Sequence, residues 1–324
     1  MLIDAHNRTV DYVRIAVTKA CNLRCSYCLR EDHDEPDQGS TRLDTGQIAS
    51  LIGLLGDMGI RKIRFTGGEP LLRRDIAELV RLAKTTPGIE DVKLTTNGVL
   101  LDKHLDRLIE AGLDGINLSL DTLSSEKFIE IARRDEFTRV RRALDTLFEN
   151  PSLRLKINTL MLRGINNDEI PAFVELTRDH VLTVRFMELQ PFDDRQIWRT
   201  GRFMGAEMIR EHLYRAYPGL EPVTGLNTEH YSFRLPGYRG SIAIIPAYSR
   251  NFCSRCSRLR ITADGRLISC LYHQESINLM PFLQNGSGKE ELRKQILESV
   301  RQKPKDGLKS GTDNAVASMS QIGG

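Results

Sequence analysis

Short apolar runs alternate with stretches of helical periodicity over the first two thirds of the chain. The apolar runs, which predict strands, cover residues 12–18, 62–66, 92–96, 116–120, 153–160 and 182–189. Apolar residues recur every three or four positions, as expected for helices, over residues 44–58, 75–84, 102–111 and 168–180. Asp44 and Asp102 are expected N-caps, and Gly59 and Gly112 are expected to follow helix ends. This alternation predicts parallel strands joined by right-handed crossovers.

Alternate positions within the predicted strands separate an apolar face from a polar face. The apolar faces can pack against helices, so the polar faces are expected to point inward. These polar faces carry Arg14, Arg64, Thr95, Asn117, Ser119, Lys156, Asn158 and Arg185. A closed eight-stranded barrel has apolar layers inside, so the basic residues predict an incomplete (β/α)6 barrel, a TIM-like α/β fold, whose open interior holds an anionic ligand. An open sheet with one solvated face is the alternative, because alternation does not reveal closure.

The pattern changes after about residue 220, where Pro and Gly become frequent. Residues 240–247 and 259–271 are typical of antiparallel hairpins. We therefore expect a partial barrel over residues 1–222 and a β-rich region over residues 223–324. Residues 303–324 are rich in Lys, Gly and Ser and are expected to be mobile.

The composition is typical of a soluble globular protein, with 40% hydrophobic and 27% charged residues. A formal net charge of +3 is too small to indicate a surface that binds nucleic acid. No run approaches the roughly 20 apolar residues that cross a bilayer, and the N-terminus lacks the features of a signal peptide. We expect a cytoplasmic protein that binds neither membrane nor nucleic acid.

Six cysteines form two groups of three, and the first group is Cys21, Cys25 and Cys28. Three thiolates at this spacing can bind three corners of a [4Fe-4S] cluster and leave its fourth iron open. Disulfides are one alternative, although they are uncommon in the cytosol. A structural zinc ion is another, but it needs a fourth ligand, for which His33 is the nearest histidine.

The second group is Cys253, Cys256 and Cys270. It again offers three thiolates without an obvious fourth ligand, which favours a second cluster with an open iron. A zinc ribbon completed by His273 is the alternative.

A predicted hairpin explains the long spacing within the second group. The pair Asp264–Gly265 favours a type I′ turn. This turn would pair Ala263 with Arg266 and Leu259 with Cys270. The three sulfur atoms could then converge at the open end of the hairpin.

The first cysteine group resembles the CxxxCxxC signature of the radical S-adenosylmethionine (SAM) superfamily, with an aromatic residue before the last cysteine. The second predicted strand ends in Thr66-Gly67-Gly68-Glu69-Pro70, which is similar to the superfamily's GGEP motif. Two glycines let the backbone approach a ligand closely. The resemblance implies that the open iron chelates SAM, and that one electron cleaves the S–C5′ bond to give a 5′-deoxyadenosyl radical.

Further motifs narrow the resemblance. They are IRFTGGEPLLRRD, TTNG, INLSLD, RFMEL, Cys256-Ser-Arg258-Leu-Arg260 and the terminal Gly323–Gly324. Over essentially its whole length the chain resembles the molybdenum cofactor biosynthesis protein A family, the GTP 3′,8-cyclases. That resemblance implies two [4Fe-4S] clusters, the first binding SAM and the second binding GTP through its guanine.

Residues at the family's functional positions are expected to have the family's roles. The expected SAM contacts are Tyr27, Gly68, Ser119 and Gln190, where Gln190 replaces the methionine usual in the family. The expected GTP contacts are Arg14, Arg64, Thr95, Lys156, Arg258, Leu259 and Arg260. The expected catalytic residues are Arg185, Gly323 and Gly324. In the family the diglycine tail reaches the active site, and a frayed terminus is the alternative.

The resemblance also implies the reaction. The radical removes the 3′ hydrogen of the GTP ribose, the C3′ radical adds to C8 of guanine, and one electron and one proton quench the last radical, with help from Arg185, the second cluster or both. The product, (8S)-3′,8-cyclo-7,8-dihydro-GTP, passes to the next enzyme of molybdopterin synthesis, cyclic pyranopterin monophosphate synthase. A flavodoxin or ferredoxin is the expected electron donor, and the expected assembly is a homodimer or a monomer.

Two other functions fit some of these features. A peptide-modifying radical SAM enzyme with two clusters is one, although its auxiliary region would need more than three cysteines. An iron–sulfur redox sensor or GTP-binding regulator is the other. It leaves the GGEP segment and the inward basic residues without a purpose.

Overall fold

The computed structural model describes residues 1–28, 42–189, 201–224, 231–248, 253–272, 275–284 and 288–306. Most of the described strands form one continuous sheet, and β1 (Leu2–Ile3) and β2 (Thr9–Val10) form a separate ribbon. In spatial order the strands of the sheet are β14 (Ile277–Asn278), β13 (Arg266–Ile268), β12 (Arg258–Ile261), β3 (Tyr12–Ala16), β4 (Lys62–Thr66), β5 (Asp91–Thr96), β6 (Gly115–Ser119), β7 (Arg154–Leu160), β8 (Leu182–Met187), β11 (Ser241–Ile245), β10 (Tyr231–Arg234) and β9 (Glu221–Val223).

The middle of the sheet is parallel. The six strands expected from the apolar runs, β3 to β8, pair with one another in sequence order. β12 lies parallel beside β3, and β11 lies parallel beside β8. The antiparallel hairpins expected in the C-terminal region do form, β12 with β13 and β10 with β11. That expectation was incomplete, because β12 and β11 also pair along their other edges and so extend the parallel sheet.

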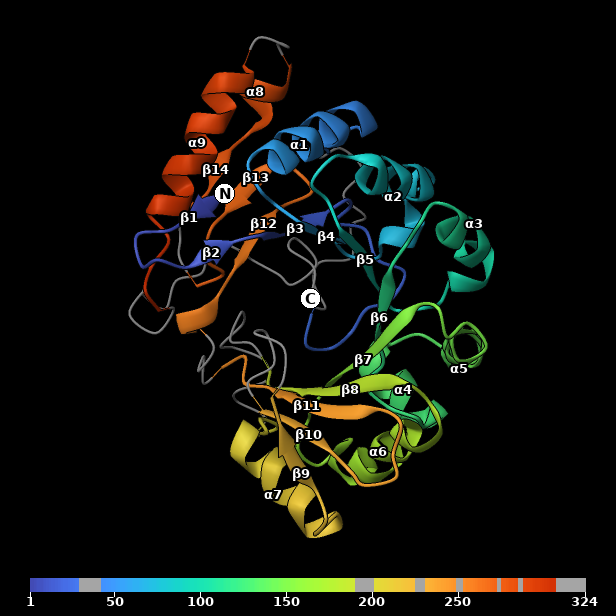
Figure 1. The fold of residues 1–324 in the computed structure, drawn as a ribbon. Helices are drawn as coiled ribbons and strands as arrows, with labels where there is room; N and C mark the ends of the chain where they lie inside the picture. The colour runs from blue at the N-terminus through green and yellow to red at the C-terminus, as the bar shows by residue number, and fades with distance from the viewer. Residues whose placement is uncertain are drawn as a thin grey trace.

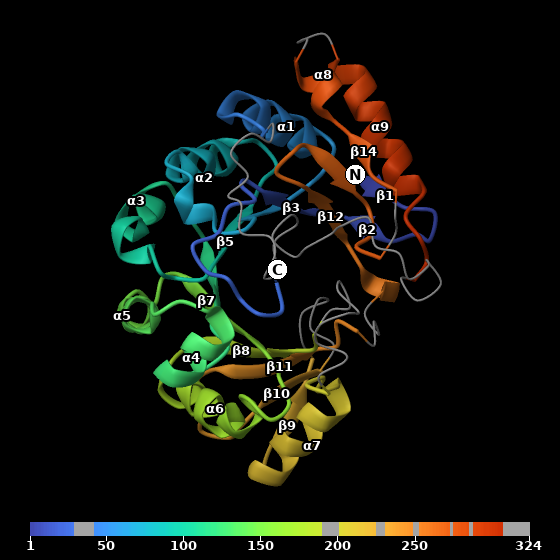
Figure 2. The same cartoon turned by 180° about the vertical axis from the view of Figure 1, so that it is seen from behind.

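The sheet curls into a partial barrel (Figures 1 and 2). The helices outside the curve are α1 (Thr45–Asp57), α2 (Ile76–Thr85), α3 (Leu105–Glu110), α5 (Phe137–Phe148) and α6 (Ile170–Asp179). Apolar strand residues such as Val13, Phe65 and Val184 are fully buried. The strand order of the described residues is linear rather than circular. The predicted incomplete α/β barrel is therefore confirmed.

Helices of the C-terminal half cover the two ends of the sheet. α7 (Ala206–Ala216) packs on α6 and β11, while α8 (Met280–Gln284) packs on α1 and α9 (Lys289–Arg301). α9 also contacts β1 and β13. Among the described helices, none has the length and apolar character needed to cross a bilayer. The boundary expected near residue 222 stays a prediction.

The ends of α1 follow from the residues there. Asp44 Oδ1 accepts a hydrogen bond from Gln47 N at 2.8 Å, and Gln47 Oε1 accepts one from Asp44 N at 2.9 Å. This reciprocal capping box confirms Asp44 as the N-cap. Gly59 and Gly112 have φ of 96° and 87° just beyond α1 and α3, which favours glycine and confirms both positions.

The expected N-cap at Asp102 is wrong. Asp102 lies inside a 3-10 turn, η2 (Leu101–Lys103), and α3 begins only at Leu105. The turn places Leu101 in the core with no exposed surface, and this delays the start of the helix.

The β12–β13 hairpin differs from the expected register by one residue. Arg260 pairs with Ile268, and Thr262 N donates to Arg266 O at 2.9 Å, so residues 263–265 form the loop. A type I′ turn needs positive φ at both central residues. In this loop only Gly265 has it, at 80°. The expected pairs Ala263–Arg266 and Leu259–Cys270 are therefore wrong, because a three-residue loop replaces the two-residue turn.

The C-terminal tail begins with a buried residue. Lys303, where mobility was expected to begin, is only 3% exposed. Residues 307–324, which include the expected catalytic pair Gly323 and Gly324, lie outside the described residues.

Candidate active site

The first cysteine group lies on the loop after the C-terminal end of β3. Backbone N–H groups of Arg24 and Ser26 donate to carbonyls in the last turn of α4 (Ser125–Ala132) at 3.0 and 2.9 Å. Tyr27 Oη donates to Asp121 Oδ2 at 2.6 Å. Burial raises the pKa of Asp121 to about 6. The loop is thus attached to the sheet at the end of β6.

The GGEP turn after β4 packs against the segment that leads into this loop. A Cβ on Gly68 would lie 2.2 Å from the carbonyl oxygen of Ala20 and 2.5 Å from that of Lys19. The Gly68 and Glu69 N–H groups donate to the carbonyls of Thr18 and Ala20 at 2.9 and 2.8 Å. The glycine is therefore required by the chain's own backbone, whereas the sequence had suggested approach to a ligand. The SAM contact expected of Gly68 stays a prediction.

Glu69 connects three of the sequence motifs. Its carboxylate accepts hydrogen bonds from Thr96 Oγ1 and Asn97 N, both at 2.8 Å. Asn97 Nδ2 donates to Asn22 Oδ1 at 2.8 Å and approaches Cys21 Sγ at 3.9 Å. Burial raises the pKa of Glu69 to about 7. The GGEP turn, the TTNG segment and the cysteine loop therefore form one network.

Gly68→Ala is expected to destabilise the protein by about 1–3 kcal/mol, because the added methyl group must displace backbone atoms. The same displacement should lower the iron bound at the first cysteine group. Gly53→Ala is the matched control, since a Cβ there meets nothing within 4 Å. Alanine in place of glycine inside helix α1 should raise the free energy of unfolding by about 1 kcal/mol. Both variants are compared with the wild type by thermal unfolding and by iron content. Equal behaviour of the two would contradict the assigned role of Gly68.

The second cysteine group lies at the opposite end of the parallel strands. Cys253 and Cys256 precede β12, and Cys270 follows β13. Because β12 runs parallel to β3, these residues lie toward the N-terminal end of β3. The first and last Cα atoms of β3 are separated by about 13 Å. The two groups therefore occupy different ends of the barrel.

All six cysteines carry thiol groups, which the expected cluster ligand sets require. All six lie in the described residues and none forms a disulfide, so the disulfide alternative is wrong. Burial raises the pKa of Cys25 well above its usual value. Burial also favours the neutral thiol of Cys256, but the charges of Lys303 and Arg258 outweigh it and hold the pKa of Cys256 at about 6. The thiolate is the ligating form of cysteine.

The zinc alternatives depend on histidines that the structure does not describe. His33 and His273, their fourth ligands, lie outside the described residues. Within the described ranges, no group of three or more His, Cys, Asp or Glu side chains is placed to bind a single metal ion.

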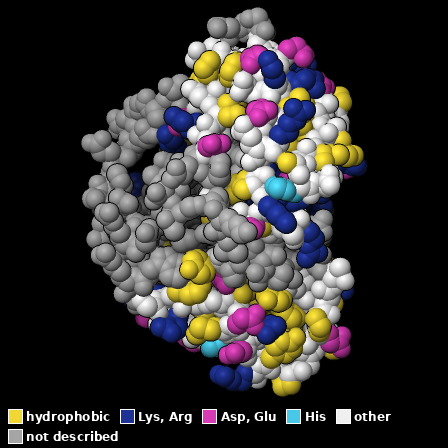
Figure 3. Space-filling model, turned by 90° about the vertical axis from the view of Figure 1, so that its left-hand side faces the viewer, with side chains coloured by type: hydrophobic (Ala, Val, Ile, Leu, Met, Phe, Trp, Pro, Cys, Tyr) yellow, Lys and Arg dark blue, Asp and Glu magenta, His cyan; other side chains and the backbone are white. Residues whose placement is uncertain are grey.

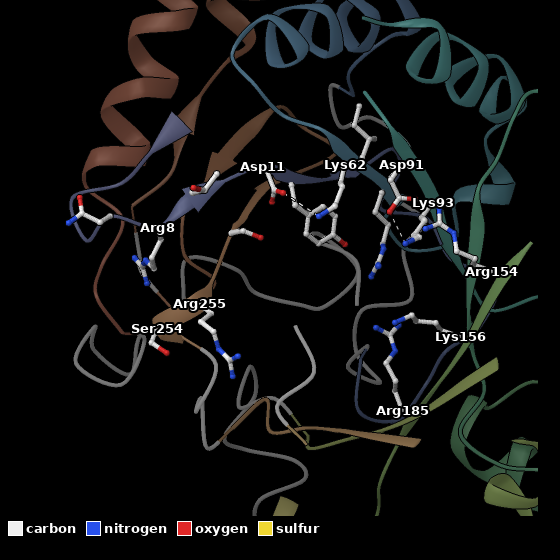
Figure 4. Close-up of a pocket in the computed structure, with 16 residues that line it drawn as sticks. Arg8, Asp11, Lys62, Asp91, Lys93, Arg154, Lys156, Arg185, Ser254 and Arg255 are labelled. Atoms are coloured by element: carbon white, nitrogen blue, oxygen red, sulfur yellow. Dashed lines mark hydrogen bonds and ion pairs between the residues drawn. The ribbon is translucent and has the colours of Figure 1, made fainter. Parts of the chain in front are cut away.

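The inner face of the sheet lines a cavity of about 680 Å³ that reaches the second cysteine loop. Figure 4 shows Lys156 and Arg185 pointing into it from the sheet and Arg255 approaching from the opposite side. The volume is typical of pockets that enclose small molecules. On the face that carries α7 and α9, by contrast, charged side chains of both signs are interspersed (Figure 3). Among the residues that line the cavity, basic side chains outnumber acidic ones.

Asn117 joins two of the buried arginines. A guanidinium group only donates hydrogen bonds, so the amide oxygen of Asn117 must face both arginines. In that orientation it accepts from Arg64 Nη1 at 2.7 Å and from Arg185 Nη2 at 2.6 Å. Asn117 is 1% exposed. Strand alternation placed it inward, but sequence reasoning assigned it no role.

Tyr12 is a second residue that sequence reasoning missed. Its hydroxyl accepts from Arg14 Nε at 3.2 Å, and the guanidinium carbons of Arg14 and Arg64 lie 5.8 and 5.4 Å from the ring centre. Burial would raise the pKa of Tyr12, but the two arginine charges outweigh it and lower the pKa to about 8. Tyr12 lies two residues before Arg14 and therefore on the same face of the strand, which could have indicated that its side chain points into the barrel.

Several polar atoms in the interior have no hydrogen-bond partner within the described residues. They include Arg64 Nε, Thr95 Oγ1, Asn158 Oδ1 and Arg260 Nε. Burial lowers the pKa of Arg64 to about 10 and, with help from the charges of Arg14 and Arg258, that of Arg260 to about 9. Buried polar groups are normally hydrogen-bonded. The interior therefore fits a polar, anionic ligand.

Comparison with known proteins agrees with this geometry. Residues 15–177 match the Radical SAM superfamily, and residues 182–308 match the Molybdenum Cofactor Synthesis C family. A GTP 3′,8-cyclase of Chlorobaculum tepidum is 70% identical over 100% of this chain and 97% of its own length. This chain belongs to the GTP 3′,8-cyclase family. A GTP 3′,8-cyclase of Syntrophomonas wolfei is 39% identical over 94% of this chain and 93% of its own length.

A solved structure shares the fold of this cyclase-family chain. Streptococcus suis SuiB bound to S-adenosylmethionine aligns with a TM-score of 0.57 at 15% identity. The alignment covers 89% of this chain and 67% of SuiB. The likeness is one of fold alone.

The structure brings together most of the residues expected from the cyclase family. Arg14, Arg64 and Arg260 lie side by side on β3, β4 and β12. Leu259 is different, because it pairs with Val13 on the apolar face and is fully buried. Its side chain therefore faces the core, and a GTP contact would have to come from its backbone. Gln190 lies outside the described residues. The individual site roles stay predictions.

Proposed function

We propose that this chain converts GTP into 3′,8-cyclo-7,8-dihydro-GTP in the barrel interior, as a step of molybdenum cofactor biosynthesis. One observation carries the proposal. Buried guanidinium groups line a cavity in a barrel that has a set of three cysteines at each end. GTP brings about four negative charges, and guanidinium groups suit paired contacts with phosphate oxygens. Basic side chains gathered on one face of the sheet favour such a ligand.

The cysteines would hold two cofactor clusters. Cys21, Cys25 and Cys28 are assigned to the first [4Fe-4S] cluster, and Cys253, Cys256 and Cys270 to the second, because each set offers three thiols on neighbouring chain segments. Each set leaves one iron open, for SAM at the first site and for guanine at the second. When bound, the first cluster and SAM supply the radical that removes a hydrogen atom from the ribose.

The protein's own residues would bind and orient the nucleotide. Arg14, Arg64, Thr95, Lys156, Arg258 and Arg260 are assigned to the nucleotide. Arg64 and Lys156 line the cavity, and Arg14 and Arg260 follow Arg64 across β3 and β12. Asn117 holds Arg64 and Arg185 in place, so the two guanidinium groups meet the ligand with little loss of freedom. We assign Arg185 to stabilise the nucleotide while the last radical is reduced and protonated. Tyr27, Gly68, Ser119 and Gln190 are assigned to SAM, and Gly323–Gly324 to the nucleotide side of the site.

The partners and location belong to the same proposal and rest on family resemblance. A flavodoxin or ferredoxin would deliver electrons, and cyclic pyranopterin monophosphate synthase would receive the product. The enzyme would act in the cytoplasm as a homodimer or a monomer.

Anaerobic incubation with GTP, SAM and dithionite tests the proposal. GTP carrying deuterium at C3′ is expected to give 5′-deoxyadenosine that contains deuterium, together with the cyclised nucleotide. ATP, which lacks the guanine that the second site would bind, is expected to remain unchanged. Deoxyadenosine without deuterium and with unaltered GTP would show that the substrate assignment is wrong.

A further inference from the structure

A short segment after α9 reaches the second cysteine group from outside the barrel. Lys303 is buried, and its Nζ donates to the carbonyl oxygen of Arg258 at 2.9 Å and to that of Ser269. Arg258 lies two positions after Cys256, and Ser269 directly precedes Cys270. One ammonium group therefore joins the two chain segments that carry these cysteines.

Arg8 attaches the same segment to the remaining cysteine. Its Nη1 donates to the carbonyl of Cys253 at 2.7 Å and to that of Lys305 at 2.9 Å, and its Nη2 donates to that of Pro304 at 2.6 Å. Asp4 fixes the Arg8 side chain, with Oδ2 at 2.6 Å from Nε. All three cysteines of the group are thus connected, through backbone carbonyls, to residues 303–305.

The charge of Lys303 needs a compensating negative charge. A buried ammonium group is costly unless it is paired. Among the described residues its hydrogen bonds go to neutral carbonyl groups, and the sulfur atoms of Cys256 and Cys270 lie close enough to interact with its charge. A cluster bound by the three thiolates of this group would keep negative charge close to the ammonium group.

We propose that Lys303 is a positioning residue for the second iron–sulfur cluster, which it aligns through the Arg258 and Ser269 carbonyls and to which it presents one positive charge. This inference rests on the proposed function, which assigns that cluster to Cys253, Cys256 and Cys270. Positive charge and hydrogen bonding near a cluster stabilise its reduced form. Loss of the Lys303 charge therefore makes the reduction potential of the second cluster more negative and leaves the first cluster unchanged.

Two substitutions separate the charge from the hydrogen bonds. Lys303→Gln removes the charge but keeps an N–H donor, and Lys303→Met removes both. Lys305→Met is the matched control, because Lys305 is exposed on the same segment. Each protein is prepared anaerobically, its iron is counted, and the potential of each cluster is measured by redox titration followed by electron paramagnetic resonance.

The wild type is expected to bind about eight irons per chain. Lys303→Gln is expected to keep both clusters and to show a more negative potential at the second only. Lys303→Met is expected to fall toward about four irons, and Lys305→Met to match the wild type. If Lys303→Met does not fold, the potentials measured for Lys303→Gln decide whether Lys303 positions the second cluster. Loss of only the second cluster from Lys303→Gln would also support the inference.

Other outcomes overturn the inference. An unchanged second potential in Lys303→Gln, or equal shifts at both clusters, would show that Lys303 has no specific role. A wild type with only about four irons would instead contradict the proposed second cluster itself. The two failures are therefore distinguishable.

Discussion

Cys25→Ser is expected to abolish SAM cleavage, whereas Cys256→Ser is expected to abolish GTP cyclisation and to leave SAM cleavage largely intact. The reason is that the two cysteine groups lie beyond opposite ends of β3, a strand about 13 Å long. Each loop also has its own attachments, Tyr27 to Asp121 for the first and Arg8 and Lys303 for the second. Loss of one cluster should therefore not unfold the other site.

The measurements are iron content, deoxyadenosine formation and cyclised nucleotide, all under anaerobic conditions. Each variant should bind about four irons instead of about eight. Ser26→Ala, in the same loop as Cys25, controls for a general disturbance of that loop and should retain both activities. If Cys256→Ser lost SAM cleavage as completely as Cys25→Ser, the two sites would not be independent.

The inner face of the barrel could be predicted from the sequence because strand alternation has a period of two. Once residues 12–18 and 62–66 were assigned as strands, Arg14 and Arg64 had to share a face opposite Val13 and Ile63. The parallel register of β3 and β4 confirms this arrangement. Because the apolar face is buried, the opposite face, which carries Arg14 and Arg64, must point into the barrel.

Long-range pairing could not be predicted in the same way. The local pattern of β12 indicates a hairpin with β13, but no feature of residues 258–261 indicates that their other edge joins β3. The Asp264–Gly265 pair also fits two loop lengths, and a single residue decides the register. The role of Asn117 depends on residues from β4, β6 and β8, and that of Lys303 on a carbonyl on either side of a hairpin. Such contacts exist only once the sheet has formed.

Arg64→Met is expected to lower kcat/KM for GTP by about 100-fold or more. The substitution removes a charge-assisted contact to the ligand, worth about 1.5–3 kcal/mol, and the hydrogen bonds that Arg64 makes to Asn117. Arg61→Met is the matched control. Arg61 precedes β4, is exposed and pairs with Glu90, so its loss should change kcat/KM less than twofold.

Stability should change in the opposite direction from activity. Arg64 is 8% exposed, forms no ion pair with a carboxylate among the described residues, and has a pKa lowered by burial to about 10. Without nucleotide its charge is destabilising, so Arg64→Met should unfold at the same temperature as the wild type or at a higher one. GTP should then stabilise the variant less than it stabilises the wild type, because part of its binding energy is gone. A variant that loses both activity and thermal stability would instead assign Arg64 to the fold rather than to the nucleotide.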